Sequence, residues 1–278
     1  MDLGITIHLT DRSIDVRDLA VAVEERGFHS LYVPEHTHIP VERSTPPPTG
    51  ESLLGEEYAR SPDPWVSLAA AAAVTERIRL GTGVALVAQH HPISLAKVVA
   101  SVDVLSAGRV VLGVGYGWNR EEMAHHAVEY ATRRDRVAEH VAAMRALWAD
   151  DEAEFHGEHV DFAPSWSWPV PVDPGGPPVL LGGGAGPRLF AEVAAWADGW
   201  MPVGGSGLAD GLADLRAACE DWGRDPEELA VVPIGTLPDE GKLDHYASLG
   251  IVETVLRVPS AGRDEVLAAL DDHARFLG

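Results

Sequence analysis

Residues 77–122 read RIRLGTGVALVAQHHPISLAKVVASVDVLSAGRVVLGVGYGWNREE, and this stretch decides the fold. An apolar run over 78–86 precedes an amphipathic segment that begins at Pro92, a residue type tolerated in the first turn of a helix. A second apolar run follows over 109–114. Two buried strands joined by one helix form a βαβ unit, so we expect these strands to be parallel. The loop after each strand, such as 115–122, then lies on the side of the sheet where parallel α/β folds bind ligands.

The alternation of a short apolar run and an amphipathic segment continues along the whole chain. We predict eight strands, over residues 2–9, 28–33, 78–86, 109–114, 178–182, 199–203, 229–234 and 252–258. A helix is predicted after each strand, over residues 15–26, 65–75, 92–106, 132–148, 188–197, 208–222, 242–249 and 263–277. Two irregular insertions are expected, 37–63 after strand 2 and 150–177 before strand 5. This pattern predicts one α/β domain over 1–278, a (β/α)8 TIM barrel.

Composition restricts the partners and the compartment. The 278 residues carry a formal net charge of −22, which argues against nucleic acid and anionic membranes as partners. No apolar run is long enough to span a bilayer, and the first residues lack the pattern of a signal peptide. The single cysteine, Cys219, excludes an internal disulfide bond. We therefore expect a cytoplasmic protein.

Several kinds of chemistry lack the residues that they need. No HExxH or HxxxH spacing occurs, so we expect no metal site. No GxSxG motif is present, and Cys219 falls in the middle of a predicted helix, which disfavours nucleophilic catalysis. The two lysines, Lys97 and Lys242, do not follow predicted strands, so a Schiff-base mechanism is also disfavoured.

A glycine-rich loop follows the fifth predicted strand. Residues 182–186 read GGGAG and lead through Pro187 into a helix. Backbone N–H groups and the helix dipole at such a position form an anion site, although a tight turn alone also uses glycine. Four glycines exceed what a turn requires, so we favour phosphate binding, with Arg188 adding positive charge.

Other polar and aromatic residues also follow predicted strands. His36 is a candidate general acid or base, or a donor to a ring-shaped ligand, and Glu35 is expected to orient it. The alternative for His36 is a structural, buried histidine. Trp118 either stacks on a ring or packs in the core. The remaining histidines near these loops are expected to face solvent: His38, His90, His91, His125 and His126.

Together these stretches resemble the bacterial luciferase-like flavin and deazaflavin oxidoreductases, and most closely the subgroup that uses coenzyme F420. The resemblance rests on five motifs that cover nearly the whole chain: GFHSLYV at 27–33 followed by Glu35-His36, RLGTGV at 79–84, LGVGYGW at 112–118, PVLLGGG at 178–184 and ADGW at 197–200. It implies a luciferase-like barrel, a homodimer, and a small organic substrate.

The resemblance also implies roles for individual residues. His36, Glu35 and Trp118 are expected to be catalytic, with His36 donating or accepting a proton. The bond between Gly83 and Val84 matches a position where the family often has a cis peptide behind the central ring of the cofactor. The residues expected to contact the cofactor are His8, Thr82, Gly83, Val84, Gly115, Tyr116, Gly117, Asn119, Gly182, Gly183, Gly184, Ala185, Gly186 and Arg188.

The expected activity is hydride transfer between F420 and the substrate. In F420-dependent sugar-phosphate dehydrogenases of this family a glutamate stands where this chain has Trp118, so sugar phosphates are not expected substrates. The alternatives are an FMN-dependent monooxygenase served by a partner reductase, and a barrel that binds a flavin or deazaflavin without turnover. F420 carries a phosphate and a polyglutamate tail, so the net charge of −22 opposes its approach at long range.

Overall fold

A curled parallel sheet forms the centre of the protein. The computed structural model describes residues 1–47, 53–205 and 207–277. Nine strands hydrogen-bond in the order β10-β11-β1-β2-β3-β4-β7-β8-β9. Their bounds are β1 Asp2–Thr6, β2 Ser30–Val33, β3 Arg79–Thr82, β4 Val110–Val114, β7 Val179–Gly182, β8 Gly199–Met201, β9 Ala230–Val231, β10 Ile234–Thr236 and β11 Glu253–Arg257.

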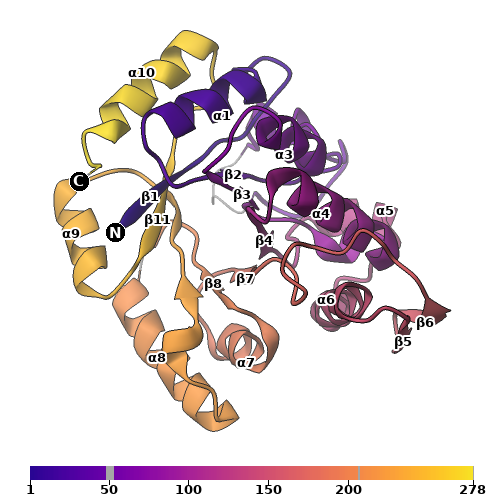
Figure 1. The fold of residues 1–278 in the computed structure, drawn as a ribbon. Helices are drawn as coiled ribbons and strands as arrows, with labels where there is room; N and C mark the ends of the chain where they lie inside the picture. The colour runs from indigo at the N-terminus through magenta and orange to yellow at the C-terminus, as the bar shows by residue number, and fades with distance from the viewer. Residues whose placement is uncertain (48–52, 206, 278) are drawn as a thin grey trace.

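The two outermost strands in this order, β10 and β9, follow each other directly in the sequence. β9 pairs with β8, and β10 pairs with β11. Between them, the Val232 N–H donates to the Trp200 carbonyl at 2.9 Å, and the Pro233 carbonyl accepts from the Val255 N–H at 2.8 Å. Pro233 has no N–H to donate, which interrupts the regular ladder. The predicted strand over 229–234 is therefore two short strands, and a bridge between Val203 and Ile234 links the two ends of the sheet. Figure 1 shows the curl of the sheet.

Helices cover the outside of this sheet (Figure 1). The long helices are α1 Val16–Glu25, α3 Pro64–Ala72, α4 Pro92–Ser106, α6 Arg133–Ala149, α7 Pro187–Trp196, α8 Leu208–Trp222, α9 Glu240–Ser248 and α10 Arg263–Ala274. Local sequence fixes where they begin. In α3, for example, the Asp63 carboxylate accepts the Trp65 N–H at 2.9 Å, and Pro64 occupies the first turn. All eight predicted helices are confirmed within a few residues at each end.

Apolar side chains pack against both faces of the sheet. The larger cluster lies between the strands and the helices, and it includes Leu19, Leu68 and Val99. A smaller cluster comes from side chains that point into the curled sheet: Tyr32, Val111, Leu180, Met201, Val232, Ile234 and Val255. The interior is therefore packed with side chains, as in barrels of parallel strands.

The structure corrects the sequence prediction in three segments. Residues 150–177, predicted to be irregular, contain an antiparallel hairpin of β5 Ala153–His156 and β6 Asp161–Ser165. The predicted loop 115–122 ends in a short helix, α5 Arg120–His125, which Asn119 caps. The strand predicted over 78–86 ends at Thr82 and is followed by a 3-10 turn, η1 Val87–Gln89. A second 3-10 turn, η2 Pro226–Glu228, precedes β9.

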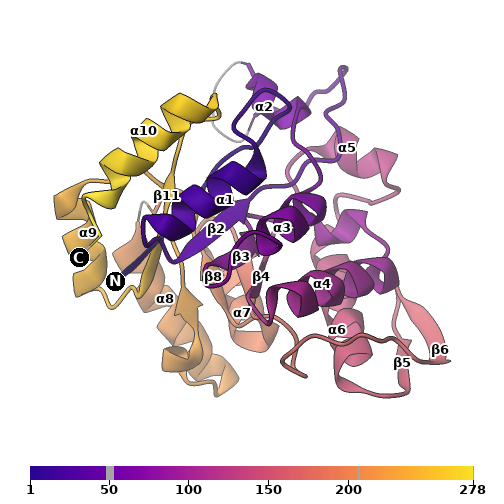
Figure 2. The ribbon, with the colours of Figure 1, turned by 45° about the horizontal axis from the view of Figure 1, so that its top comes forward.

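The insertion predicted over 37–63 contains one short helix, α2 Glu56–Ala59. Residues 48–52 of this insertion lie outside the described residues. Figure 2 shows that α2 and α5 lie at the same end of the sheet. In the part of the chain that the structure describes, no helix has both the length and the apolar character needed to cross a membrane.

Candidate active site

The predicted site residues lie where the strands end. His8 follows β1, Glu35 and His36 follow β2, and Thr82 ends β3. The loop over 115–119 follows β4, and the glycine-rich loop follows β7. Because the strands are parallel, all these segments lie at the carboxyl end of the sheet.

His36 is held between two side chains from the segment after β4. Its Nδ1 lies 2.8 Å from Oε2 of Glu122, and its Nε2 accepts a hydrogen bond from the Trp118 indole N–H at 3.2 Å. An indole N–H only donates, so Nε2 carries no proton here and Nδ1 donates to the carboxylate. His36 and Glu122 are 9% and 1% exposed, respectively. This arrangement fixes the orientation of a buried imidazole against a buried carboxylate.

Glu35 does not orient His36, which corrects the sequence interpretation. Its Oε2 accepts the Leu86 backbone N–H at 2.6 Å, and its Oε1 lies 2.6 Å from Nε2 of His90. Burial alone would lower the pKa of His90, but the hydrogen bond and the charge of Glu35 outweigh burial and raise it. His90 is therefore not a free solvent-facing histidine. Glu35 instead fixes the loop that follows β3.

A chain of hydrogen bonds leads from His36 toward solvent. The second oxygen of Glu122 accepts the Thr37 backbone N–H at 3.1 Å. The Thr37 hydroxyl lies 2.7 Å from Nε2 of His126 and 3.0 Å from Nδ1 of His38. His38 in turn contacts the exposed His125 at 2.8 Å. Of these histidines, His125 is exposed as predicted, whereas His38 and His126 are only partly exposed, and all three are linked to the buried pair.

His8 contributes a partly buried ring whose Nδ1 is unused. Its Nδ1 is buried and has no hydrogen-bond partner among the described residues. Burial lowers the pKa of His8 to about 4, against the opposing charge of Glu57. Its ring lies 4.8 Å from the Tyr58 ring, centroid to centroid, and Tyr58 also packs near His36 and Trp118. Tyr58 belongs to α2, and sequence analysis did not select it.

Glycines make room for Val84 at the carboxyl end of the sheet. A Cβ on Gly115 would lie 2.4 Å from one Val84 methyl group, and a Cβ on Gly182 would lie 2.7 Å from the other. The Gly83–Val84 peptide bond is cis, as the resemblance implied. The Thr82 hydroxyl is buried and donates to the Gly113 carbonyl at 2.7 Å. Val84 thus forms a half-buried apolar ledge between the loops after β4 and β7.

The loop after β4 is fixed at three positions. The Tyr116 hydroxyl donates a hydrogen bond to Glu192 of α7. Gly117 has a φ of 77°, a conformation that favours glycine. Asn119 accepts the Glu122 N–H through Oδ1 at 3.2 Å, whereas its buried Nδ2 has no partner among the described residues. The loop is thus held by hydrogen bonds at both Tyr116 and Asn119, and the Asn119 Nδ2 is an unused donor.

The glycine-rich loop leads into α7 without a side-chain cap. Gly183 accepts a hydrogen bond from the Trp200 indole at 2.9 Å, which fixes the start of the loop. No described atom lies within 4 Å of the position that a Cβ would take on Gly184 or Gly186. Ala185 is exposed between them. The first turn of α7 has no acidic residue and no capping side chain, so it suits an anion.

Arg188, predicted to add positive charge at this loop, lies in the first turn of α7. Its side chain is 61% exposed, and its guanidinium lies 3.4 Å from both Glu192 and Asp135. The structure therefore gives Arg188 carboxylate neighbours rather than a solitary position beside the loop.

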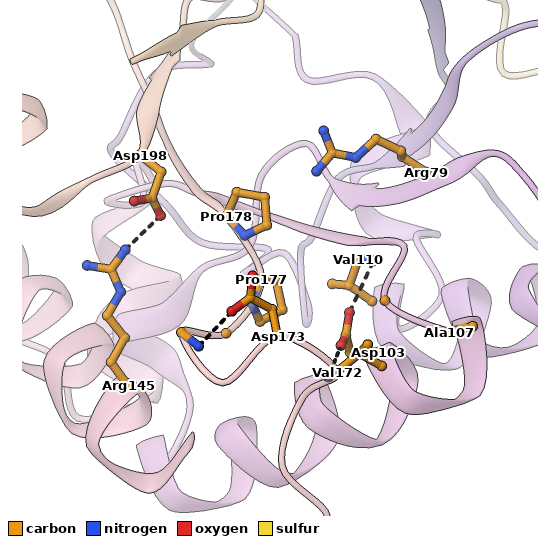
Figure 3. Close-up of a pocket in the computed structure, with 13 residues that line it drawn as sticks. Arg79, Asp103, Ala107, Val110, Arg145, Val172, Asp173, Pro177, Pro178 and Asp198 are labelled. Atoms are coloured by element: carbon orange, nitrogen blue, oxygen red, sulfur yellow. Dashed lines mark hydrogen bonds and ion pairs between the residues drawn. The ribbon is translucent and has the colours of Figure 1, made fainter. Parts of the chain in front are cut away.

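A separate pocket of about 640 Å³ opens at the opposite, amino end of the strands (Figure 3). Arg145 donates to Asp198 at 2.7 Å, and Asp103 accepts the Val172 N–H at 2.8 Å. Arg79 extends toward this pocket from the first position of β3. None of the predicted site residues lines it. Over the described ranges, no group of three or more His, Cys, Asp or Glu residues is arranged to hold a metal ion.

Comparison with known proteins extends over the whole chain. The family model for luciferase-like monooxygenases matches residues 6–237. The protein Rv0953c of Mycobacterium tuberculosis (strain ATCC 25618 / H37Rv) is 43% identical over 100% of this chain and 99% of its own length. An F420-dependent hydroxymycolic acid dehydrogenase from the same organism is 29% identical over 76% of this chain and 55% of its own length.

Two solved structures share the fold. The monooxygenase RslO1 from Streptomyces bottropensis has a TM-score of 0.79 and 22% identity, over 100% of this chain and 98% of that one. An F420-dependent secondary alcohol dehydrogenase in complex with an F420-acetone adduct also has a TM-score of 0.79, at 18% identity over 99% and 98% of the two chains.

Proposed function

The chain belongs to the luciferase-like monooxygenase family, and we propose that it is an oxidoreductase that transfers hydride between coenzyme F420 and a small organic substrate. The observation that carries this proposal is the His36–Glu122–Trp118 arrangement at the carboxyl end of the sheet. The similarity to an F420-dependent dehydrogenase over 76% of the chain supports the choice of cofactor.

The residues at this end of the sheet fit a flat ring with polar edges and a phosphate. Val84 offers an apolar surface for a ring. At the same end of the sheet, Nδ1 of His8 and Nδ2 of Asn119 are buried without a hydrogen-bond partner among the described residues. The open backbone over 184–186 and the uncapped start of α7 suit the phosphate. When bound, F420 supplies a ring that gives or accepts hydride.

His36 would manage the proton that accompanies hydride transfer. Its Nε2 is unprotonated and accepts only the Trp118 N–H, so a substrate hydroxyl that replaces this donor can pass its proton to Nε2. Glu122 then stabilises the positive imidazolium through the 2.8 Å contact at Nδ1. In the reverse direction the same nitrogen protonates a developing alkoxide. The Thr37 hydroxyl lies 3.5 Å from Oε1 of Glu122 and 3.0 Å from Nδ1 of His38, and it offers this proton a route toward solvent.

Trp118 and Tyr58 would shape the substrate pocket, and Glu35 would act at a distance. The Trp118 ring meets the His36 ring edge-on at 5.6 Å between centroids and Tyr58 at 6.3 Å. These aromatic walls suit a small, apolar alcohol or ketone. Glu35 is a positioning residue, because it fixes Leu86 and His90 rather than the reacting groups.

An FMN-dependent monooxygenase is the second candidate. The family model and the shared fold of RslO1 support it. The loop over 183–186 suits the phosphate of FMN as well as that of F420, and a partner reductase would then be needed. A barrel that only binds a cofactor is less favoured, because the buried His36–Glu122 pair has no role in binding alone.

A fluorescence titration of the purified protein with F420 and separately with FMN tests the proposal. We expect F420 to bind at micromolar concentration or below, about −8 kcal/mol, and FMN to bind more weakly. Binding of FMN alone would support the monooxygenase, and binding of neither would contradict both. With F420 bound, oxidation of secondary alcohols or reduction of ketones is then followed by cofactor absorbance.

We also propose that the protein is a homodimer through the outer face of α3 and α4. An apolar groove of about 410 Å³ lies there, and Val66 and Leu105 are 70% and 68% exposed. Trp166 and Trp168 lie close by, because Lys97 of α4 donates to the Trp168 carbonyl at 2.5 Å. A continuous apolar surface of this kind is typical of an interface. Light scattering should give twice the chain mass, and Leu105→Lys should reduce it.

A further inference from the structure

Four arginines gather beside the glycine-rich loop. Arg120 begins α5, Arg133 and Arg134 begin α6, and Arg188 lies in the first turn of α7. We call these four residues the arginine cluster. Each of these helices starts at the carboxyl end of the sheet, so the cluster lies at the same end as the candidate active site.

Two tyrosines hold the cluster together. The guanidinium carbons of Arg120 and Arg133 lie 4.3 Å and 3.5 Å, respectively, from the centroid of the Tyr130 ring. The guanidinium carbon of Arg134 lies 3.9 Å from the centroid of the Tyr116 ring. Because Tyr116 belongs to the loop after β4 that lines the candidate site, the cluster is continuous with that site.

Only part of the positive charge is neutralised. Glu192 forms an ion pair with Arg134 at 2.5 Å and a longer one with Arg188 at 3.4 Å. Arg120 and Arg133 form no ion pair with any described residue, and the Nε of Arg133 is buried without a hydrogen-bond partner among them. Burial lowers the pKa of Arg133, and the charges of Arg134, Arg188 and Arg120 add to this effect.

This arrangement is unfavourable in the protein alone. Helix dipoles place partial positive charge at helix starts and disfavour cations there. The first turns of α5 and α6 also carry Glu121, Glu122 and Asp135, but Glu121 binds Ser44 and Thr45, Glu122 binds His36, and Asp135 pairs with Arg188. A chain of net charge −22 also has many carboxylates from which to neutralise a cation, yet two arginines here lack one. An anionic ligand would relieve both the repulsion and the opposition of the dipoles.

We propose that the arginine cluster binds the carboxylates of the polyglutamate tail of F420. The inference rests on the proposed function, because it concerns the part of that cofactor beyond the phosphate. The loop over 183–186 would hold the phosphate, and Arg188, two residues further along, is where the tail would begin to meet the cluster. The cluster also explains how so acidic a chain can bind a polyanion. At physiological salt, charges more than about 8 Å apart are largely screened from each other, so the nearby arginines outweigh the distant carboxylates once the ligand is in contact.

The test compares F420 that carries a tail of several glutamates with the form that ends without glutamate. Fluorescence titration gives a dissociation constant for each form at low and at physiological salt. We expect the wild-type protein to bind the long-tailed form more tightly at low salt, and this preference to shrink as salt rises. Equal affinity for both forms at low salt would overturn the inference.

The variants Arg120→Gln and Arg133→Gln, alone and combined, remove the two cations of the cluster that form no ion pair with a described residue, without touching the catalytic residues. The double variant should bind the long-tailed form about fivefold more weakly and the tail-less form as the wild type does. Arg275→Gln, just after α10, is the matched control: it removes an exposed cation that pairs with Asp272 at 2.8 Å, at the amino end of the sheet, and should change neither constant. Circular dichroism checks that each variant is folded.

Each other outcome contradicts a specific claim. An equal loss for both forms of F420 would assign the arginines to the phosphate and overturn the tail site. No loss for either form would remove the cluster from cofactor binding. Failure of the wild-type protein to bind any form of F420 would overturn the proposed function, and the inference with it.

Discussion

The two ends of the sheet differ in how their polar groups are satisfied. At the amino end, the pocket of about 640 Å³ contains paired charges: Arg145 with Asp198, and Asp103 with two backbone N–H groups (Figure 3). None of its side chains is among the described buried polar atoms without a partner. At the carboxyl end, His8 and Asn119 each keep a buried polar atom unpartnered. The candidate site therefore differs from the larger amino-end pocket in its unused hydrogen-bonding capacity.

The largest loss of turnover should come from a substitution at the carboxyl end of the sheet, His36→Gln. Loss of the proton-accepting nitrogen should lower turnover of the F420-dependent reaction by about 100-fold or more, with little effect on cofactor affinity. The measurement is kcat with the best alcohol or ketone, together with a dissociation constant for F420. Turnover equal to that of the wild type would remove His36 from the reaction.

The acid sensitivity of the protein should also originate at the carboxyl end. The pKa of His8 lies at about 4 in the folded protein, below its ordinary value of 6.5. Between these values the unfolded chain binds the extra proton, so stability falls as the pH drops from 6.5 toward 4. From pH 7.5 to pH 5, His8 alone should account for about 2 kcal/mol of lost stability.

Urea unfolding at the two pH values measures this effect. His8→Asn should reduce the loss of stability, whereas the same change at the exposed His91 should not. His140 contributes in the same direction in both variants, because burial lowers its pKa to about 4 as well. An unchanged pH dependence in His8→Asn would contradict the buried, neutral state of His8.

At the amino end, the expected effect is on stability and not on function. Asp103 is 3% exposed and accepts the Val110 N–H at 3.3 Å and the Val172 N–H at 2.8 Å. Asp103→Ala should lower the free energy of unfolding by about 2 kcal/mol, because two backbone donors lose their acceptor. Asp173→Ala, at an exposed residue of the same pocket, is the control. Weaker F420 binding by a folded Asp103→Ala protein would break the distinction between the ends.

A smaller change is expected from Gly115→Ala. The added Cβ would lie 2.4 Å from a Val84 methyl group, so the ledge that would back the ring must shift. We expect F420 to bind about tenfold more weakly, a change of about 1.4 kcal/mol. Gly241→Ala on α9 is the control, since its added Cβ would lie 3.6 Å from the Asp239 carboxylate, an ordinary contact distance. Unchanged affinity in Gly115→Ala would mean that Val84 does not contact the cofactor.

The repeating strand–helix pattern was predictable because burial of each element leaves a periodic trace in the sequence. The motifs that follow the strands placed His36, Trp118 and the glycine-rich loop at one end for the same reason. The hairpin of β5 and β6 was missed, since it is short, largely exposed and rich in charge.

The partners of the site residues were less accessible to sequence analysis. Glu122 pairs with a histidine 86 positions earlier in the chain, and adjacency in sequence wrongly favoured Glu35. Such pairing depends on the geometry of α5, which the sequence analysis treated as part of a loop. The position of Glu122 four residues after the GYGW motif was the one available signal.

A crystal structure of the protein grown with F420 tests the central claim most directly. We predict the deazaflavin ring at the carboxyl end of the sheet, against Val84 and beside His36, with its phosphate at 183–186. A ring bound in the amino-end pocket of Figure 3, between Arg79 and Arg145, would contradict the account.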